Sequence, residues 1–156
     1  MNSGPTLSTG ATGADVKRVQ RILVMIKLLL YTGIDGVFGT DTDTGVRAFQ
    51  ASNALVVDGV VGPVTWKAMP ADPDTPELSI GSSGSEVVAM QQTLVNGGFY
   101  TGSVDGIFGP ITEAAVRAYQ LQRGVTVDGV VGDRTWWVPA GAVGATLASL
   151  SGLTTV

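Results

Sequence analysis

The stretch VDGVVG occurs twice in the chain, at residues 57–62 and again at residues 127–132. Each copy is followed two residues later by Thr-Trp, at residues 65–66 and 135–136. An Asp-Gly pair is typical of a tight turn, because glycine adopts positive φ and the aspartate bonds the nearby backbone. Each copy is therefore interpreted as a structured turn that leads into a short helix holding the tryptophan.

The repetition extends through most of the chain. Toward the N-terminus the offset between the copies changes from 70 to 71, and the YTG triplet at 31–33 stands one residue nearer its Asp-Gly than the triplet at 100–102. Such a length change belongs in a surface loop. The sequence thus predicts a duplication of one unit of roughly 65 residues. The segments that match at an offset of 70 are 34–39 with 104–109 (IDGVFG, VDGIFG) and 46–50 with 116–120 (VRAFQ, VRAYQ).

The composition narrows the classes of partner. The chain has 156 residues, a net charge of -4 and no cysteine, which argues against nucleic acid and anionic membranes as partners. The most apolar run, at 22–30, is too short to span a bilayer and contains Lys27. Met1–Leu7 shows no signal peptide, so we expect a location in the cell wall or outside the cell after lysis, or in a virion.

Helical signals occur at matching places in both copies. Thr12–Asp15 and Ser83–Glu86 have the form of a capping box, and apolar residues follow at helical spacing. Proline at residue 110 suits the first turn of a second helix. We predict an all-α fold with two three-helix modules at 1–69 and 78–138, a proline-rich linker at 70–77 and an apolar tail at 139–156. The expected core positions of the two main helices are Val16, Val19, Leu23, Ile26, Val46 and Phe49 in the first copy, and Val87, Met90, Leu94, Val116 and Tyr119 in the second.

The ordered motifs resemble those of a known family. L-x-x-G-x-x-G-x-x-V-x-x-x-Q, then YTG, DG-x-FG, VRA[FY]Q, VDGVVG and TW occur twice, over about Leu7–Met69 and Leu78–Val138. This pattern is similar to the peptidoglycan-binding domain family, three-helix modules that accompany bacterial and phage cell-wall enzymes. The resemblance implies that the stem peptide and glycan of peptidoglycan are the partner. The second copy departs from the first at Trp137-Val138-Pro139, where the third helix of the first copy continues.

Catalytic chemistry finds little support in these residues. The chain has no histidine and no cysteine, which excludes Ser-His-Asp and Cys-His sites and His-ligated zinc within it. Glycosidases need two carboxylates, but Asp35 and Asp58 each precede a turn glycine, as do Asp105 and Asp128. The acidic run at 40–45 lacks the ligand pattern of a calcium loop. We therefore expect no enzyme activity, no metal and no cofactor.

Candidate binding residues lie on the second helix of each copy. Arg47 and Gln50 are three residues apart and share a face, and Arg117 and Gln120 repeat the pair. Stem peptides carry carboxylates, which an arginine can hold with two parallel hydrogen bonds. Two structural alternatives stay open, namely that the glutamines bond the neighbouring loop backbone and that the arginines pair with a local acid.

Aromatic residues supply further candidates. Tyr31 and Tyr100, at the start of the first Asp-Gly loop in each copy, could stack on sugar or peptide, or pack in the core. Trp66 and Trp136 are expected in the core, because a very small domain needs large apolar anchors. Phe38 and Phe108 are interpreted in the same way.

Two functions compete at this point, and a third alternative, a fragment of a lysin whose catalytic domain was removed, is disfavoured because the chain starts at Met1. The first is bivalent, non-catalytic binding of peptidoglycan. The second is a structural role in a phage particle or related injection machine, in which a scaffold protein contacts the tail at 140–156. This tail is uncharged and apolar and has no motif of its own, so what surrounds it discriminates between the two functions.

Overall fold

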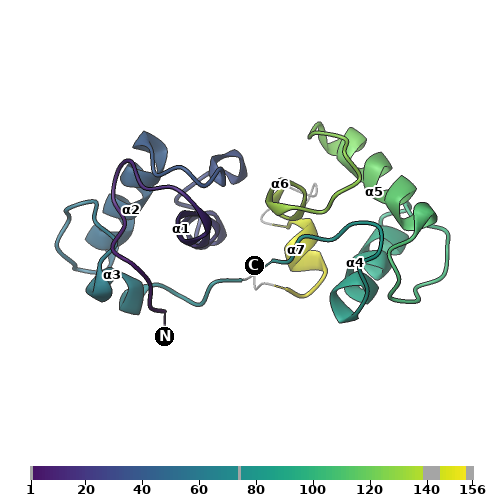
Figure 1. The fold of residues 1–156 in the computed structure, drawn as a ribbon, viewed down its shortest axis with the longest axis horizontal. Helices are drawn as coiled ribbons and strands as arrows, with labels where there is room; N and C mark the ends of the chain where they lie inside the picture. Colours follow the sequence, from purple (N-terminus) through teal and green to yellow (C-terminus); the bar gives the residue numbers. More distant parts are fainter. Residues whose placement is uncertain (1, 74, 139–144, 154–156) are drawn as a thin grey trace. The chain divides into compact units, whose positions relative to one another are not determined.

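The computed structural model describes residues 2–73, 75–138 and 145–153, which fall into two units, Met1–Asp74 and Thr75–Val156 (Figure 1). The first unit contains α1 (Ala14–Met25), the short 3₁₀ helix η1 (Tyr31–Gly33), α2 (Thr40–Ser52) and α3 (Pro63–Ala68). The second contains α4 (Ser85–Asn96), α5 (Pro110–Arg123), α6 (Asp133–Trp137) and α7 (Leu147–Leu150). Strand pairing among the described residues is limited to isolated β-bridges. The all-α fold with two helical modules is confirmed.

Each unit has its own core, which contains the tryptophan that follows the second Asp-Gly loop. Trp66 and Trp136 are completely buried, as expected from the sequence. The indole Nε1 of Trp66 donates to the carbonyl of Pro5 at 2.8 Å, and that of Trp136 donates to the carbonyl of Pro76 at 2.6 Å. The predicted core residues of the two main helices are buried except Ile26, which is half-buried. Phe38 and Phe108 are buried as well.

The predicted capping boxes are wrong. The N-cap residues of α1 and α4 are Gly13 and Gly84, with φ of 111° and 124° and no side-chain cap. The physical reason is that Thr12 and Ser83 are already paired in β-bridges with the first Asp-Gly loop of their unit. The amide of Gly13 donates to the carbonyl of Gly36 at 2.9 Å, so a backbone loop takes the place of the side-chain cap.

One hydrogen-bond network occurs four times in the chain. In the first unit the amide nitrogen of Gln50 donates to Asp58 Oδ1, the Val60 carbonyl and Thr65 Oγ1. Its amide oxygen accepts from the backbone of Asp58 and Gly59. Gln20 makes the same five kinds of bond to the loop at Asp35. Gln120 makes the same five kinds of bond to the loop at Asp128. Gln91 makes four of them to the loop at Asp105.

The predicted linker is bound to the units at both of its ends. Asp72 pairs with Arg21 of the first unit at 2.9 Å. Thr75 Oγ1 donates to Asp133 Oδ1 at 3.3 Å, and Pro76 receives the bond from Trp136. Pro76 thus has the role in the second unit that Pro5 has in the first. The second unit begins inside the segment that the sequence assigned to the linker.

The described part of the predicted tail packs onto the second unit. α7 contacts α4 and α6, and Leu147 and Ala148 are buried. Thr93 Oγ1 on α4 bonds the carbonyl of Leu150 at 3.2 Å and lies 3.0 Å from Ser151 Oγ. α7 is therefore a fourth helix of the second unit, in a segment that the sequence analysis assigned to a tail contacted by a scaffold protein. The remaining tail positions lie outside the described residues.

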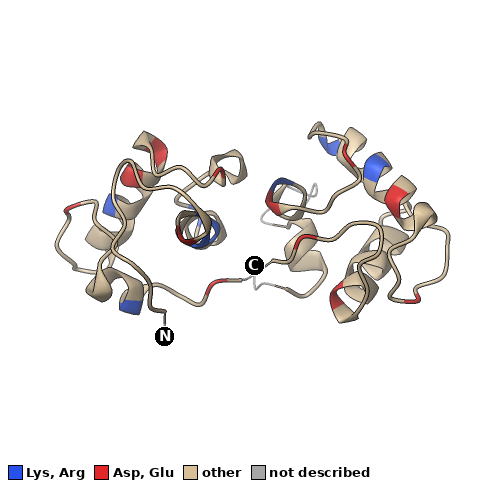
Figure 2. Cartoon of the chain, viewed as in Figure 1, with Lys and Arg blue, Asp and Glu red and all other residues tan. Residues whose placement is uncertain are grey.

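Two features of the expected surface can be checked directly. Within the described ranges, no helix is long and apolar enough to cross a membrane. Acidic and basic residues both occur on α2 and on α5 (Figure 2), and ion pairs join Arg47 to Asp43 at 2.9 Å and Arg117 to Glu113 at 3.1 Å. Opposite charges are thus paired locally on the helices that carry the predicted arginines.

Candidate ligand-binding sites

Gln50 and Gln120 lie inside their units rather than on the surface. Each is 1% exposed, and each amide is fully used by the loop network described above. The structure thus shows the alternative in which these glutamines bond the neighbouring loop. A ligand at the surface has no free amide atom of Gln50 or Gln120 to contact, so neither is retained as a contact residue.

Arg47 lies at the surface beside the second Asp-Gly loop. Its Nε bonds Asp43 Oδ2 at 2.9 Å, and its Nη2 donates to the carbonyl of Asp58 at 3.2 Å. The pair covers Gly59, where a Cβ would collide with both side chains. The side chain of Arg47 remains 47% exposed, which leaves part of the guanidinium open to a ligand.

Arg117 repeats this arrangement in the second unit. Its Nε bonds Glu113 Oε1 at 3.1 Å, and its Nη1 donates to the carbonyl of Val127 at 3.3 Å. Its side chain is 44% exposed. Both arginines therefore pair with a local acid, as in the structural alternative considered above, and the side chains of both remain partly accessible.

The two tyrosines are not placed alike. Tyr31 begins η1 and is half-buried. Tyr100 is buried, and its hydroxyl donates to the carbonyl of Ser103 at 2.5 Å and lies 3.5 Å from the amide nitrogen of Gln91. Tyr100 is thus part of the interior network, and only Tyr31 presents a partly open ring. The reason is the length change in this loop, which gives the identical YTG triplets different positions.

An apolar hollow of about 290 Å³ adjoins the second Asp-Gly loop of the first unit. Asp58 lines the hollow and also accepts the hydrogen bond from Arg47, so one loop joins the arginine to the hollow. Val56 and Val64 are 78% and 67% exposed. Sequence reasoning missed these residues, although exposed valines around a turn were the available signal. The lining is Leu55, Val56, Asp58, Val60, Gly62, Pro63, Val64 and Thr65.

The second unit has a different chemistry at the corresponding positions. At the offset of 70, Pro63 and Val64 are replaced by Asp133 and Arg134, and Val56 is replaced by Thr126. Charged and polar side chains thus stand where the first unit offers apolar surface. The two modules share a framework but differ in the chemistry of this surface.

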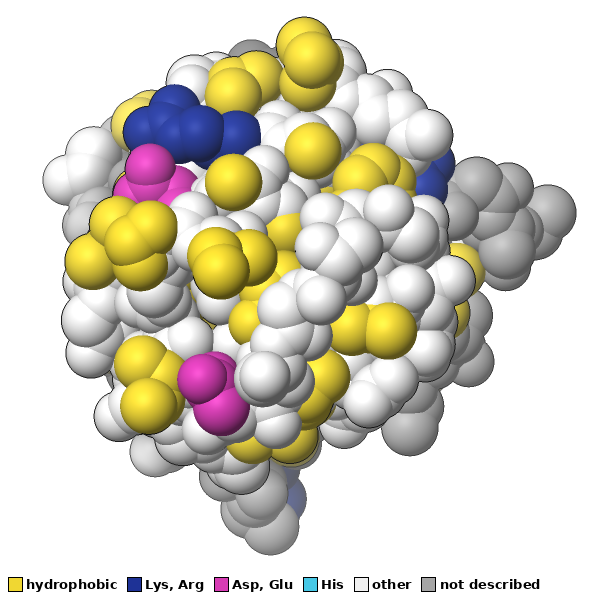
Figure 3. Space-filling view, turned by 90° about the vertical axis from the view of Figure 1, so that its right-hand side faces the viewer, with side chains coloured by type: hydrophobic (Ala, Val, Ile, Leu, Met, Phe, Trp, Pro, Cys, Tyr) yellow, Lys and Arg dark blue, Asp and Glu magenta, His cyan; other side chains and the backbone are white. Residues whose placement is uncertain are grey.

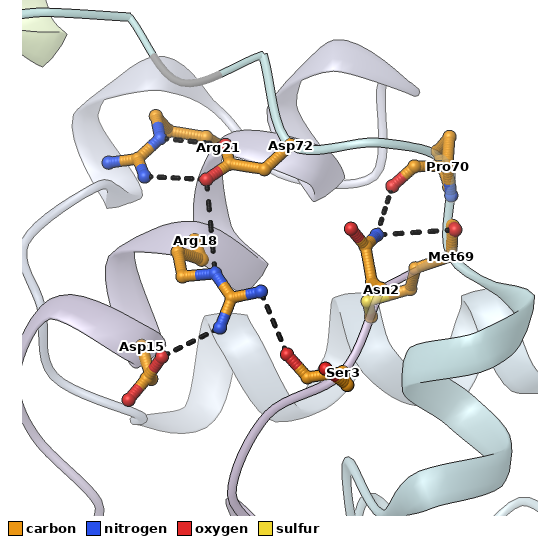
Figure 4. Close-up of polar contacts among 8 residues, drawn as sticks. All are labelled: Asn2, Ser3, Asp15, Arg18, Arg21, Met69, Pro70 and Asp72. Atoms are coloured by element: carbon orange, nitrogen blue, oxygen red, sulfur yellow. Dashed lines mark hydrogen bonds and ion pairs between the residues drawn. The ribbon is translucent and has the colours of Figure 1, made fainter.

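A second, polar hollow of about 560 Å³ lies beside α1. In Figure 4 the carboxylate of Asp72 faces both Arg21 and Arg18, at 2.9 and 3.9 Å. Asn2 donates to the carbonyls of Met69 and Pro70 on the opposite side. Arg18 also bonds Asp15 at 2.7 Å and lies over the ring of Trp66. Since these cations already have carboxylate partners, this cluster is an anchor for the chain after α3.

The loop carboxylates carry the clearest electrostatic signature. The backbone amide of Val60, and next the amide of Gln50, hold the pKa of Asp58 below its ordinary value. The amide of Ile107, followed by Gln91, lowers the pKa of Asp105 in the same way. These aspartates stay charged to stabilise turns, which is the turn role that the sequence favoured over a paired-carboxylate site. In the part of the chain that the structure describes, no group of three or more acidic residues could hold a metal ion.

Comparison with known proteins matches both units to one family. Residues 12–69 and 83–137 match the peptidoglycan binding domain. The chain is 33% identical over 148 residues to the N-acetylmuramoyl-L-alanine amidase CwlM of Mycobacterium tuberculosis, which covers 85% of this chain and 36% of that protein. It is 30% identical over 161 residues to the amidase CwlL of Bacillus licheniformis, over 86% of this chain and 45% of that protein. The solved SleB N-terminal domain is 44% identical, covers 36% of this chain and 78% of its own, and has a TM-score of 0.36.

The expectation that the chain has no enzymatic role is contradicted by these relatives. The two relatives described above match over most of the chain, and both are named as amidases. The expectation rested on the lack of histidine and cysteine among 156 residues. The chain spans less than half the length of either relative. The residue types present in this chain therefore do not determine the chemistry of the full-length relatives.

Proposed function

This chain belongs to the peptidoglycan-binding domain family, and from that premise we propose that it binds bacterial cell-wall peptidoglycan through both of its units. The observation that carries the proposal is the family match of two separate segments, 12–69 and 83–137. Each segment lies in a unit with its own buried core. Two framework copies on one chain suit a polymer with repeating sites.

In the first unit, the proposed contact surface is Arg47 with the adjoining apolar hollow. The exposed part of the guanidinium offers a stem-peptide carboxylate a charged donor. The exposed valines of the hollow offer apolar contact beside it. Specific sites commonly combine a few polar groups with an apolar lining, and this surface has that composition. Arg117 supplies the charged donor in the second unit.

Co-sedimentation with purified insoluble peptidoglycan tests the proposal. The intact chain is expected in the pellet at protein concentrations well below those at which it sediments alone. If an excess of soluble muropeptide prevents the chain from binding the wall, the wall peptide is identified as the ligand. A chain that stays in the supernatant at all wall concentrations would refute the proposal.

The role of Arg47 is tested by the pair Arg47→Ala and Asp43→Ala. Removing Arg47 should weaken wall binding by about 1–3 kcal/mol, because a charge-assisted hydrogen bond is lost. Removing Asp43 frees the guanidinium from its partner, so affinity should stay the same or rise. Equal losses in both variants would mean that the ion pair itself, rather than a ligand contact, matters.

Amide hydrolysis in the wall is the second candidate, because relatives over most of the chain carry the name N-acetylmuramoyl-L-alanine amidase. Hydrolysis of that amide adds water across the bond and leaves one carboxylate and one new primary amine. The test is to measure primary amines released from the same wall samples over time. A steady rise with protein concentration supports this candidate, and a flat trace removes it for this chain.

A further inference from the structure

The second unit contains a pocket of about 290 Å³ between α4, α5 and α7. Phe99 and Tyr119 meet there edge to face, with ring centroids 5.3 Å apart. The guanidinium of Arg123 lies 5.2 Å from the centre of the Tyr119 ring. One wall comes from Leu150 of α7, which is beyond the segment that matches the family. The pocket is therefore a feature of this chain rather than of the shared framework.

Two buried polar atoms of the pocket residues have no partner. The hydroxyl of Tyr119 and the Nε of Arg123 are both buried without a hydrogen bond of good geometry, and Tyr119 as a whole is only 4% exposed. The guanidinium of Arg123 is the charged group that acts on this hydroxyl. Burial raises the pKa of Tyr119 and outweighs the opposing effect of the Arg123 guanidinium beside it, so the hydroxyl keeps its proton and can donate it to a ligand. An unpaired buried polar group is costly and is rare in folded proteins. A ligand that accepts hydrogen bonds from these two donors would remove the free-energy cost of leaving them unpaired.

The first unit cannot form the same pocket. At the offset of 70, Tyr119 corresponds to Phe49 and Arg123 corresponds to Asn53, and Asn53 already bonds the carbonyl of Phe49 at 2.9 Å. On the face drawn in Figure 3, hydrophobic side chains occur at several places among backbone and other side chains. The pocket differs from this exposed apolar surface because it also contains the unpaired donors of Tyr119 and Arg123.

We propose that this pocket binds a short N-acylated amino acid with a free carboxylate, the chemistry of the terminal residue of a peptide stem. The carboxylate accepts from Arg123 and from the Tyr119 hydroxyl, while a small apolar side chain lies against Leu94 and Phe99. The pocket volume suits a ligand of this size. The proposal rests on the proposed wall binding for the source of the ligand, and it gives the second unit a specificity that the first lacks.

The test titrates the intact chain with N-acetyl-D-alanine, followed by amide NMR. Gly97 and Leu150 should shift, since both line the pocket. N-acetyl-D-alaninamide has the same shape without the charge. Its affinity should be lower by about tenfold or more. Shifts confined to other residues, or equal affinity for the two probes, would overturn the proposal.

Variants separate ligand contact from folding. Arg123→Gln should lower the affinity for N-acetyl-D-alanine by about tenfold. Lys67→Gln makes the same charge change on α3 and should leave this affinity unchanged. Tyr119→Phe should weaken the probe several-fold without lowering the melting temperature, because the hydroxyl is unpaired in the free protein. Unchanged probe affinity in Arg123→Gln and Tyr119→Phe would overturn the assignment.

Wall sedimentation of the intact chain keeps the two proposals apart. A chain that sediments but ignores N-acetyl-D-alanine overturns the pocket and leaves wall binding in place. A chain that binds the probe at Gly97 and Leu150 but does not sediment supports the pocket and refutes wall binding.

Discussion

At the scale of single residues, a buried glutamine amide organises every Asp-Gly loop. Gln20 lies 15 residues before Asp35, while Gln50 lies 8 residues before Asp58, yet both make the same set of bonds. The two glutamines reach their loops from the middle of α1 and the end of α2. The loop geometry thus depends on a helix-borne side chain and not on the Asp-Gly pair alone.

This network predicts a large effect of Gln50→Ala. The substitution leaves the amides of Asp58 and Gly59 without their acceptor, and buried unpaired donors are expensive. We expect a loss of about 3 kcal/mol in the free energy of unfolding of the first unit. Urea titration followed by NMR signals of that unit measures it. Gln122→Ala, at an exposed position on α5, is the control and should change little.

The loop aspartates predict acid sensitivity. Hydrogen bonds lower the pKa of Asp58 and Asp105 below the ordinary value of 3.8, so the folded protein binds fewer protons than the unfolded chain in that range. The free energy of unfolding should therefore fall as the pH is lowered below about 4. The variant Asp58→Asn/Asp105→Asn keeps acceptor oxygens but cannot titrate there. Urea midpoints between pH 5 and pH 2 should depend less on pH in this variant, and identical slopes would contradict the assignment.

At the scale of elements, periodicity and turn chemistry predicted most of the fold. The apolar positions of α1, α2, α4 and α5 and the Asp-Gly turns followed from local rules, because helix faces and positive φ leave a direct mark in the sequence. The N-caps did not, since the β-bridges of Thr12 and Ser83 join residues far apart in the chain. Gln50 and Gln120 were proposed as surface contacts for a similar reason. Helical spacing shows which face a residue shares, but not that a distant loop covers it.

The packing of α7 also escaped local rules and can be tested. Leu147 is 1% exposed, so Leu147→Ala should cost about 2 kcal/mol of the stability of the second unit through lost burial and the cavity left behind. Leu150→Ala removes the same atoms from a 55% exposed position on the same helix and should cost far less. Thermal unfolding of the two variants compares them. Equal, small effects would mean that the tail contributes nothing to the module.

At the scale of the whole molecule, the chain forms two compact units joined by a short connection. Asp72 is held by the first unit and Thr75 by the second, so little of the predicted linker at 70–77 is independent of both. The units differ at their surfaces, with an apolar hollow beside Arg47 in the first and the α7 pocket in the second. The two copies thus keep one framework but differ in the surface hollows that we propose as binding sites.

Two units on one chain predict avidity on the wall. Once one unit has bound a polymer with repeating sites, the other binds at high effective concentration, which raises apparent affinity without any new contact. We expect the halves 1–74 and 75–156 each to bind insoluble wall roughly tenfold or more weakly than the intact chain. This division keeps Asp72 with Arg21 and Pro76 with Trp136, so neither core loses its anchor.

The control for avidity is a monovalent ligand. Each half that binds the wall should bind a monomeric muropeptide with the affinity of its own site in the intact chain, because one small ligand cannot bridge two units. Tryptophan fluorescence of the halves checks that Trp66 and Trp136 remain buried. If one half alone matches the intact chain on the wall, only that unit is a binder and duplication serves no avidity. The polar replacements at Asp133 and Arg134 make the first unit the one expected to retain binding in that case.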